Sequence, residues 1–291
     1  MGIYAAIDIG TNSCRLLLAE REGGKIKPLR MELKTTRLGE GVSDSGYIKD
    51  QALERTVVAL VKFKSYLEGY GVEKIGVVAT NAAREASNSF ELLKAIRDNT
   101  GFEVEIVSGE EEARLSYKGV ASSMDNFAGV PVVLDIGGGS TEVIFSKNGE
   151  LRDASVGVGA VRCTEDKTSP TKIMEELQSV LNEVISLGDD SELIGVGGTI
   201  TTLAAIKKKL EVYDREAVHG SVLKRDEVEE LFFSLFDMTL EERKGVPGLQ
   251  PERADIITAG ALILWLVLTY LEKDEIIVSE TDILHGILLD L

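Results

Sequence analysis

The sequence of 291 residues predicts an α/β protein built from two lobes. Strand-like apolar runs alternate with helical patterns along the chain, which is typical of α/β folds. The pattern Asp-Ile-Gly-x-x-Ser also occurs twice, at residues 8–13 and 135–140, each time between two β-prone runs. We therefore expect one lobe from residues 1–125 plus 281–291, a second lobe from residues 126–280, and an active-site cleft between them.

The first copy follows the run Ile3 to Ile7 and leads into Leu16 to Leu18, which predicts a strand, a glycine loop and a second strand. Glycine lets backbone amides converge on an anion, and an arginine in the outgoing strand can hold phosphate bidentately. Strand alternation turns Cys14 to the opposite face, so we expect a buried thiol and no nucleophile there. The candidate phosphate-binding residues are Thr11, Asn12, Ser13 and Arg15, and Asp8 is a candidate metal ligand.

Helices and strands are then expected in alternation up to residue 121. Asn88 and Glu91 have the spacing of a capping box at the start of one helix. Arg84 follows the polar pair Thr80-Asn81 and is either a phosphate clamp or a solvated side chain. The expected elements are a helix over 50–70, a strand over 74–79, a helix over 88–98, a strand over 103–107 and a helix over 109–121.

Three consecutive glutamates open the last of these helices. With Ser108 as N-cap, Glu111 is the N3 partner of a capping box, and Glu110 favours the helix dipole while remaining solvated. Glu112 has no such local task and begins the inner face of the helix. A carboxylate there can accept a proton from a water held near a metal. Spacing alone leaves Glu112 open between this role and that of an ordinary helix carboxylate.

The second copy lies between the runs 130–134 and 143–145 and contains three consecutive glycines. Asp135 ends the incoming strand, and Glu142 lies across the glycine turn in the outgoing one. Mg²⁺ typically takes one or two protein carboxylates together with waters and substrate phosphates. The alternative is that Asp135 merely caps the turn, but the glycines and the repeat favour a site. The candidate residues are Asp135 and Glu142 for the metal, and Gly137, Gly138, Gly139 and Ser140 for phosphate.

The chain after the second copy continues the α/β alternation. Residues 195–199 form a third glycine turn, which is either an anion nest at a helix start or a tight strand–helix connection. Arg253 either pairs with Asp255 or reaches the cleft. The expected elements are a strand over 154–158, a helix over 170–187, a strand ending near 196, and helices over 200–210, 226–236 and 256–271, then a strand over 276–279 and a closing helix to 291.

The charge distribution argues against sequence-independent binding to duplex nucleic acid. The net charge is −17; residues 1–125 carry 17 Lys and Arg against 19 Asp and Glu, and residues 126–291 carry 15 against 30. A chain of this charge does not neutralise a phosphate backbone over a broad surface. A polyanionic substrate would need a bound cation, amide nests and a few placed basic residues, and the near-neutral first part is where an extended anion would lie.

Cysteine and histidine usage points to a cytoplasmic protein. Cys14 and Cys163 make no disulfide framework, and the N-terminus lacks the basic segment of a secretion signal. His219 and His285 are isolated, so we expect both to be structural. The apolar run 256–271 is shorter than the roughly 20 residues of a membrane span and is expected to form a buried core helix that can also serve a homodimer interface.

These motifs together resemble the exopolyphosphatase/guanosine pentaphosphate phosphatase (Ppx/GppA) family. The family belongs to the superfold of actin, sugar kinases and Hsp70, whose lobes are ribonuclease H-like. One glycine loop is weak evidence, whereas the ordered set covers nearly the whole chain. The Glu-Glu-Ala-Arg segment separates the family from the kinases of the superfold. The matching segments are 8–15, 80–84, 108–120, 135–142, 197–203, 218–220 and 247–255.

The resemblance implies a Mg²⁺-dependent, or Mn²⁺-dependent, exopolyphosphatase that hydrolyses phosphoric anhydrides. Glu112 would be the general base, and Asp135 and Glu142 would organise the metal and the attacking water. The amides of the two loops would hold terminal phosphates with help from Arg84. Guanosine pentaphosphate (pppGpp) is the alternative substrate, because the same residues would cleave it.

One segment, 279–286, departs from the family pattern: His285 stands where we expect an arginine, and an acidic residue is missing. This departure leaves the chain-length preference open. An ATP-dependent kinase would use residues 195–199 for its nucleotide and would leave Glu112 without a role. A silent phosphate or nucleotide sensor would not need Glu112, Asp135 and Glu142 together.

Overall fold

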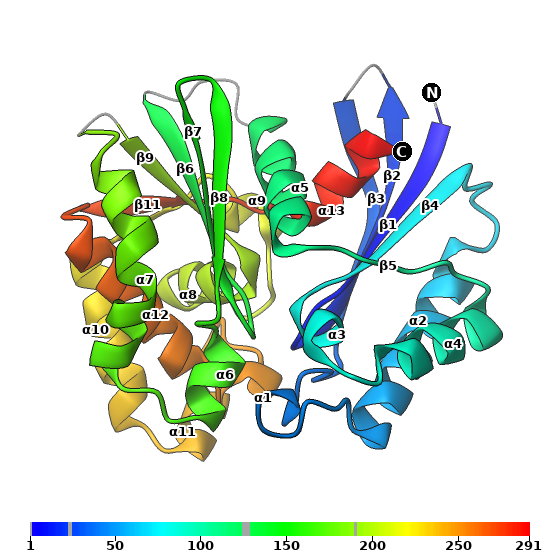
Figure 1. The fold of residues 1–291 in the computed structure, drawn as a ribbon, viewed down its shortest axis with the longest axis horizontal. Helices are drawn as coiled ribbons and strands as arrows, with labels where there is room; N and C mark the ends of the chain where they lie inside the picture. The colour runs from blue at the N-terminus through cyan, green and yellow to red at the C-terminus, as the bar shows by residue number, and fades with distance from the viewer. Residues whose placement is uncertain (1, 23–24, 124–128, 189–190) are drawn as a thin grey trace. The chain divides into compact units, whose positions relative to one another are not determined.

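The computed structural model describes residues 2–22, 25–123, 129–188 and 191–291 of the chain. It divides into two compact units, Met1–Met124 with Asp282–Leu291 and Asp125–Thr281. The lobe boundary expected between residues 125 and 126 lies outside the described residues. Each unit holds one mixed sheet with helices, so the α/β prediction is confirmed (Figure 1).

Unit 1 is built on a five-stranded sheet in the order β3-β2-β1-β4-β5. β1 pairs antiparallel with β2, and β1, β4 and β5 run parallel. Parallel strands end at the same edge of a sheet, so the loops after these three strands lie together. The strands are β1 (Gly2–Ile9), β2 (Ser13–Glu22), β3 (Lys25–Thr35), β4 (Lys74–Ala79) and β5 (Glu105–Ile106), and the helices are α1 (Val42–Ser45), α2 (Asp50–Leu67), α3 (Asn81–Glu85), α4 (Ser89–Thr100), α5 (Gly109–Ala121) and α13 (Ile283–Asp290).

The edge strand β3 was not expected from the sequence. Its residues are exposed or half-buried throughout, so it lacks the apolar run that marks a buried strand. Pro28 lies in it near a register shift at Leu18/Ala19 of β2. Charged side chains and proline are typical of edge strands, because both discourage pairing with another chain.

The helix α4 begins where expected, but its predicted capping box does not form. The Asn88 side chain makes no capping bond; its Oδ1 accepts from Ile48 N at 2.9 Å and its Nδ2 donates to Ile48 O at 3.1 Å. Asn88 is therefore a buried tie to the segment before α2, a tertiary partner that local spacing does not reveal.

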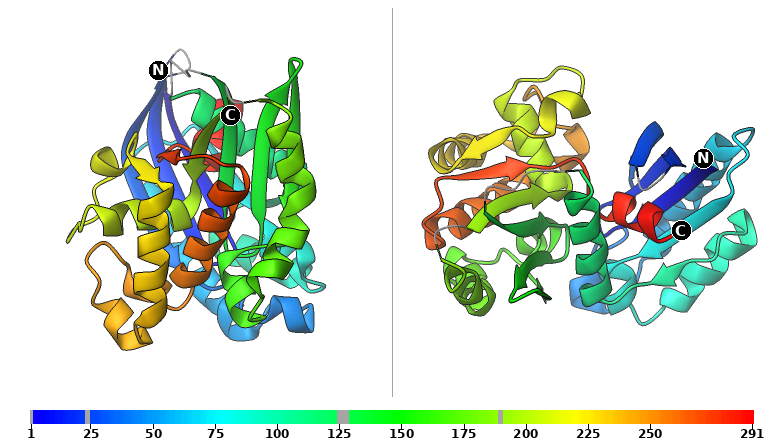
Figure 2. Two further views of the ribbon diagram at one scale, coloured as in Figure 1. Left: turned by 90° about the vertical axis from the view of Figure 1, so that its left-hand side faces the viewer. Right: turned by 90° about the horizontal axis from the view of Figure 1, so that it is seen from above.

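Two glycines bring the C-terminal helix α13 into backbone contact with α5 in unit 1. A Cβ at Gly119 of α5 would lie 1.9 Å from Asp282 O, and a Cβ at Gly286 of α13 would lie 2.0 Å from Leu115 O. The two helices lie side by side in Figure 1 and in the right-hand view of Figure 2. Only glycine permits this approach, so the packing is specified by sequence.

Unit 2 is built on a six-stranded sheet in the order β10-β11-β9-β6-β7-β8. The strands β6, β7 and β8 form antiparallel hairpins, and β9 lies parallel to β6 and β11. The strands are β6 (Val130–Ile136), β7 (Thr141–Lys147), β8 (Glu150–Val156), β9 (Ser191–Val196), β10 (Val222–Lys224) and β11 (Glu275–Val278), and the helices are α6 (Ala160–Glu165), α7 (Pro170–Ile185), α8 (Gly197–Lys207), α9 (Arg215–Val218), α10 (Arg225–Asp237), α11 (Leu240–Lys244), the 3₁₀ turn η1 (Pro251–Arg253) and α12 (Ile257–Tyr270).

The apolar helix α12 is a core helix, as its composition predicted. It buries Ile257, Ile263, Leu264 and Val267 among other apolar residues of unit 2. Burial on this scale is the main favourable term in folding, at roughly 25 cal/mol for each Å² of apolar surface. Across the described parts of the chain, no helix has both the length and the apolar character that crossing a membrane requires.

Candidate active site

The two Asp-Ile-Gly-x-x-Ser copies fold into the same local structure. In each, the glycine amide donates to the serine carbonyl, from Gly10 N to Ser13 O at 3.0 Å and from Gly137 N to Ser140 O at 2.9 Å. The aspartate lies opposite the residue seven positions later in both hairpins, Arg15 in the first and Glu142 in the second. The sequence repeat is therefore a structural repeat, one in each unit.

The carbonyl oxygens of both loops are bonded by the chain that follows. Gly39 N donates to Thr11 O at 2.9 Å in the first loop, and Val161 N donates to Gly138 O at 2.8 Å in the second. Within the described residues, the amides of Thr11, Asn12, Gly138 and Gly139 donate to no partner. Loops with satisfied carbonyls and available amides have the donor set of an anion nest.

A close approach by Gly159 supports the second loop. A Cβ at Gly159 would lie 2.5 Å from Gly138 O and from Ser140 N. The start of α6 therefore packs directly on the loop backbone, and Ala160 N donates to Gly137 O at 2.9 Å.

Arg15 contacts two carboxylates of unit 1. Its Nε and Nη2 donate to Asp8 Oδ2 at 2.9 and 2.6 Å, and its Nη1 donates to Asp282 Oδ2. Burial raises the pKa of Asp8 against the opposing effect of Arg15. Burial also tends to raise the pKa of Asp282, but the charges of Arg15 and His285 outweigh burial and hold the pKa of Asp282 below its usual range. The arginine expected to grip phosphate is thus placed as a bridge between two aspartates.

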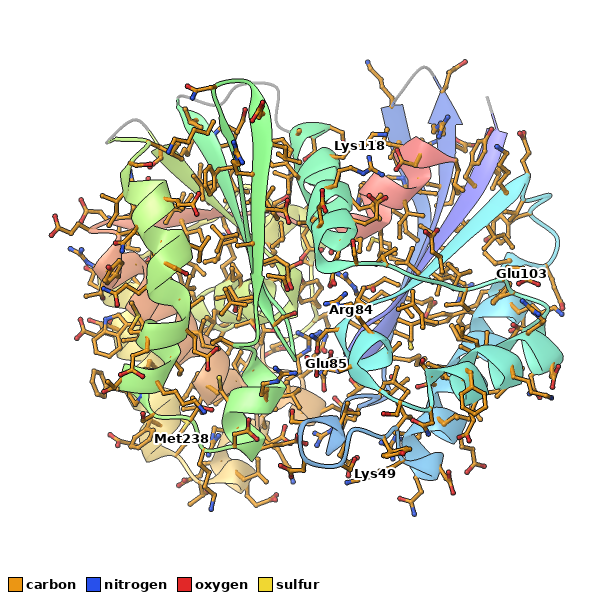
Figure 3. The ribbon with its side chains drawn as sticks, in the orientation of Figure 1. Lys49, Arg84, Glu85, Glu103, Lys118 and Met238 are labelled. Atoms are coloured by element: carbon orange, nitrogen blue, oxygen red, sulfur yellow. The ribbon has the colours of Figure 1, made fainter. Side chains whose placement is uncertain are left out.

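Arg84, labelled in Figure 3, forms a pair with Glu112 at the carboxyl edge of the unit 1 sheet. α3 begins directly after β4, and Val107 N bonds Ala79 O at 3.1 Å, which holds the chain before α5 against the end of β4. Arg84 Nη1 donates to Val107 O at 2.9 Å and to Glu112 Oε2 at 3.1 Å. The side chain of Glu112 is 13 % exposed.

The other two glutamates behave differently from Glu112. Ser108 Oγ accepts from Glu111 N at 3.1 Å, so the predicted N-cap forms. The carboxylate of Glu111 binds Arg114, three residues on in the same helix, at 2.7 Å, so the predicted capping box forms only through the Ser108 side chain. Glu110 is exposed, as expected.

Asp135 and Glu142 lie opposite each other on β6 and β7 in unit 2. Glu142 is 2 % exposed, and its Oε1 accepts from Ser155 Oγ at 2.8 Å. Gly197 lies against Asp135, because a Cβ on Gly197 would be 2.2 Å from Asp135 Oδ1. Gly197 has φ +84°, a left-handed conformation that favours glycine. The third glycine turn thus leaves room for the carboxylate of Asp135.

The third turn is also the start of a helix, because α8 begins at Gly197. Arg253 is 8 % exposed, and a Cβ on Gly198 would lie 1.9 Å from its Nη1. The same nitrogen is 3.4 Å from Thr202 Oγ1. Arg253 therefore packs on the backbone of the turn.

Asp135 and Glu142 in unit 2, and Asp8 in unit 1, offer oxygen donors of the kind that Mg²⁺ takes together with water and substrate phosphates. Among the described residues no three His, Cys, Asp or Glu side chains cluster closely enough to hold a metal by themselves. Mg²⁺ does not require such a cage, since it usually keeps several waters and takes one or two carboxylates. Asp8 Oδ1 is buried and has no hydrogen-bond partner among the described residues, which suits a group that faces a cation.

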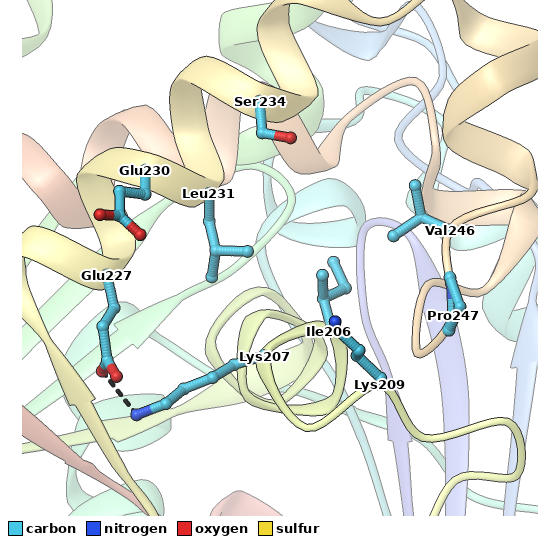
Figure 4. A pocket seen from close by; sticks show the side chains of 9 residues that line it. All are labelled: Ile206, Lys207, Lys209, Glu227, Glu230, Leu231, Ser234, Val246 and Pro247. Atoms are coloured by element: carbon cyan, nitrogen blue, oxygen red, sulfur yellow. Dashed lines mark hydrogen bonds and ion pairs between the residues drawn. The ribbon is translucent and has the colours of Figure 1, made fainter.

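The remaining predicted features have structural roles. Cys14 is fully buried and burial raises the pKa of its thiol to about 12, so it is no nucleophile. His219 Nδ1 accepts from Glu280 N at 3.2 Å, and His285 is buried in α13. A pocket of about 570 Å³ in unit 2 contains none of the predicted site residues. It is lined from α8, α10 and the segment at Val246 and Pro247 (Figure 4).

Two α/β units that each carry an aspartate and a phosphate-type glycine loop define a phosphate-handling protein of the actin-like class. Residues 17–291 match the model of the Ppx/GppA phosphatase family, and the chain belongs to that family. The two-lobed fold class predicted from the sequence is confirmed by structures of family members.

Relatives of this chain cover nearly its whole length. Exopolyphosphatase 2 of Mycobacterium tuberculosis is 33% identical over 99% of this chain and 98% of its own. A bifunctional 3-dehydroquinate synthase/phosphatase of Fusobacterium nucleatum is 36% identical over 99% of this chain, which spans only 46% of that relative.

Solved structures of family members have a similar fold. A Ppx/GppA family member of Aquifex aeolicus has a TM-score of 0.81 at 33% identity, covering 99% of this chain and 97% of its own. An exopolyphosphatase of Cytophaga hutchinsonii has 0.88 at 27% identity, covering 99% and 98%.

Sequence reasoning missed two supporting residues. Ser155 bonds Glu142 across a strand pair, and Asp282 meets Arg15 from the other end of the chain. Asp282 left a local signal, as an aspartate before an apolar helix, which is typical of an N-cap. The turn that contains Gly197 was predicted, but the room that Gly197 leaves for Asp135 was not.

Proposed function

We propose that the protein is a Mg²⁺-dependent exopolyphosphatase that releases orthophosphate from the end of inorganic polyphosphate by water attack. The observation that carries this proposal is the Arg84–Glu112 pair, which holds a half-buried carboxylate in a fixed orientation at the carboxyl edge of the unit 1 sheet. A kinase needs no such base for water. The match to exopolyphosphatase 2 over nearly the full length of both chains supports the same activity.

The two glycine loops bind the terminal phosphates in this proposal. The amides of Thr11 and Asn12 act from unit 1 and those of Gly138 and Gly139 from unit 2, whereas the amide of Gly137, which was also expected to bind phosphate, already donates to Ser140 O. Backbone donors fixed in advance stabilise developing charge without reorganisation. Arg84 assists by contacting phosphate when substrate enters, and Arg15 acts through Asp8.

Asp135 and Glu142 of unit 2 and Asp8 of unit 1 would be the protein ligands of the metal. When bound, Mg²⁺ neutralises charge on the transferred phosphate and orients it for displacement. Mn²⁺ can replace it, because Mn²⁺ also prefers oxygen ligands. Ser155 keeps Glu142 in one orientation through its hydrogen bond.

Glu112 takes a proton from water while the water oxygen attacks the terminal phosphorus. The bond from that phosphorus to the bridging oxygen breaks. The bridging oxygen leaves as part of the new terminal phosphate of the shortened chain, and orthophosphate carries the hydroxyl of the water. Positioning and charge neutralisation supply most of the rate in such reactions.

The charge pattern suits an extended anion along unit 1. Residues 126–291 have a net charge of −15 and residues 1–125 one of −2, so the first part repels a polyanion less. We place the protein in the cytoplasm, in keeping with two free, buried cysteines, and α12 remains a candidate homodimer element.

Phosphate release from long-chain polyphosphate tests the proposal. Purified full-length protein is incubated with polyphosphate and Mg²⁺, with chelator and Mn²⁺ arms, and orthophosphate is measured over time. We expect release that requires the metal. Absence of release with either metal across a broad pH range would disprove the proposal, and faster turnover of pppGpp in a parallel assay would assign the protein to that substrate instead.

A further inference from the structure

Arg15 connects the first glycine loop to the start of the C-terminal helix. Asp8 and Asp282, the two carboxylates that it bridges, are 5 % and 6 % exposed. Asp8 precedes the glycine loop, whereas Asp282 follows 267 residues after Arg15. Buried charges need partners, so the arrangement holds only while all three groups are present.

Asp282 uses its two oxygens for different tasks. Oδ1 accepts from Leu284 N at 3.1 Å and so caps α13, while Oδ2 accepts from Arg15 Nη1. The other two guanidinium donors both reach Asp8 Oδ2. A planar guanidinium with donors on two sides fixes the plane of each carboxylate that it contacts.

We infer that Asp282 is a positioning residue for Asp8, acting through Arg15 to aim Asp8 Oδ1 at the divalent cation. This inference rests on the proposed function, which assigns a divalent cation to Asp8. With Oδ2 held by Arg15, Oδ1 is the oxygen left for a cation, and it has no partner within the described residues. Partners of this kind orient metal ligands, and their loss typically costs about 10- to 100-fold in metal affinity or activity.

The same residue lies where α13 meets the helix of the proposed base. A Cβ at Gly119 of α5 would lie 1.9 Å from Asp282 O, so the backbone at Asp282 is fixed against α5. Glu112 lies in the first turn of α5. Asp282 therefore connects the strand end that carries Asp8 with the helix that carries Glu112.

A purely structural role for Asp282, as the cap of α13, is the competing explanation. Asp282→Asn separates the two roles, because asparagine caps helices about as well as aspartate. Its single carbonyl oxygen can serve Leu284 N, but the amide nitrogen then faces Arg15 with the wrong polarity. Asp290→Asn is the matched control: it removes a carboxylate of the same helix that binds Arg114 and Lys118 and does not contact Arg15.

Mn²⁺ binding to the full chain without substrate, followed by electron paramagnetic resonance, is the primary measurement. We expect Asp282→Asn to weaken Mn²⁺ binding by about 10- to 100-fold with an unchanged circular dichroism spectrum. Asp290→Asn should bind Mn²⁺ as the wild type does. Arg15→Lys keeps the charge but cannot bridge two carboxylates, so it should weaken Mn²⁺ binding too. The double variant should bind Mn²⁺ about as tightly as the single variant that binds it more weakly, because both changes break the same chain of contacts.

Several results would overturn the inference. They are wild-type Mn²⁺ affinity in Asp282→Asn, an equal loss in Asp290→Asn, additive losses in the double variant, or no Mn²⁺ binding by the wild type. If Asp282→Asn does not fold, Arg15→Lys decides the matter, since it leaves the cap intact. A wild type that binds Mn²⁺ but releases no phosphate would defeat the proposed function alone, and the binding series would still test Asp282.

Discussion

Arg84 Nη1 lies 3.1 Å from Glu112 Oε2 and 2.9 Å from Val107 O, so one nitrogen connects the candidate base with the chain that leads into its helix. The two side chains come from α3 and α5, which follow the parallel strands β4 and β5. The pair therefore follows from the topology of the sheet. The pair gives the Glu112 carboxylate a defined orientation and places the positive charge of the Arg84 guanidinium beside it, where it can attract an incoming phosphate.

Glu112→Gln is expected to reduce the turnover of polyphosphate by about 10²- to 10⁴-fold, because an amide cannot accept the proton of the attacking water. Substrate binding should persist, since the loop amides and Arg84 remain. Steady-state kinetics and equilibrium polyphosphate binding measure the two effects. Glu110→Gln, on the exposed side of the same turn, is the control and should behave as wild type. Wild-type turnover in Glu112→Gln would remove Glu112 from the mechanism.

Arg84→Lys is expected to lower kcat/KM by about 10- to 100-fold, because lysine cannot reproduce the planar contacts that orient Glu112. The charge is retained, so an effect of this size reports geometry and not net electrostatics. The control is Arg97→Lys in the exposed pair with Glu103. An unchanged kcat/KM in Arg84→Lys would show that the orientation of Glu112 does not depend on the guanidinium.

Gly197→Ala is expected to raise the Mg²⁺ concentration needed for half-maximal activity, since the added Cβ would lie 2.2 Å from Asp135 Oδ1 and displace that carboxylate. Its φ of +84° adds a backbone cost of about 1–2 kcal/mol. Gly188→Ala separates the two effects: Gly188 has φ +85° with nothing within 4 Å of the added Cβ. Both variants should lose stability in urea unfolding. A shift in Mg²⁺ requirement of equal size in both would attribute it to backbone strain.

The parts of the site that sequence could predict are those encoded within a few residues. The glycine loops follow from a repeated hexapeptide, and the N-cap Ser108 places Glu112 in the first turn of α5. The apolar run of α12 likewise predicted a buried helix. Both kinds of signal are local periodicities or spacings.

The contacts that escaped prediction join distant parts of the chain. Asp282 meets Arg15 across 267 residues and Asn88 bonds Ile48 across 40, so no window of sequence contains either pair. β3 is different, because Leu29, Met31 and Leu33 alternate with charged residues, and this local period of two is typical of a half-buried strand. The roles assigned to individual site residues remain predictions, and the variants above test them.

Asp290→Asn is expected to destabilise the protein at neutral pH by about 0.5–1 kcal/mol, a value kept low because the ion pairs of Asp290 are partly exposed to solvent. Burial by itself raises the pKa of Asp290, but hydrogen bonds from Arg114 and Lys118 outweigh it and hold the pKa below its ordinary value. A carboxylate with a lowered pKa in the folded state stabilises the fold above the unfolded-state pKa of about 3.9. That contribution disappears as pH falls through the lower folded-state pKa.

Urea unfolding of wild type and Asp290→Asn at pH 7 and at pH values below the aspartate range measures the difference in the free energy of unfolding. The gap should close at acid pH and narrow in high salt, because salt screens exposed ion pairs. Asp98→Asn, in the exposed pair with Lys94, is the control and should change little. A gap that stays the same at every pH would show that Asp290 holds α13 through packing and not through its charge.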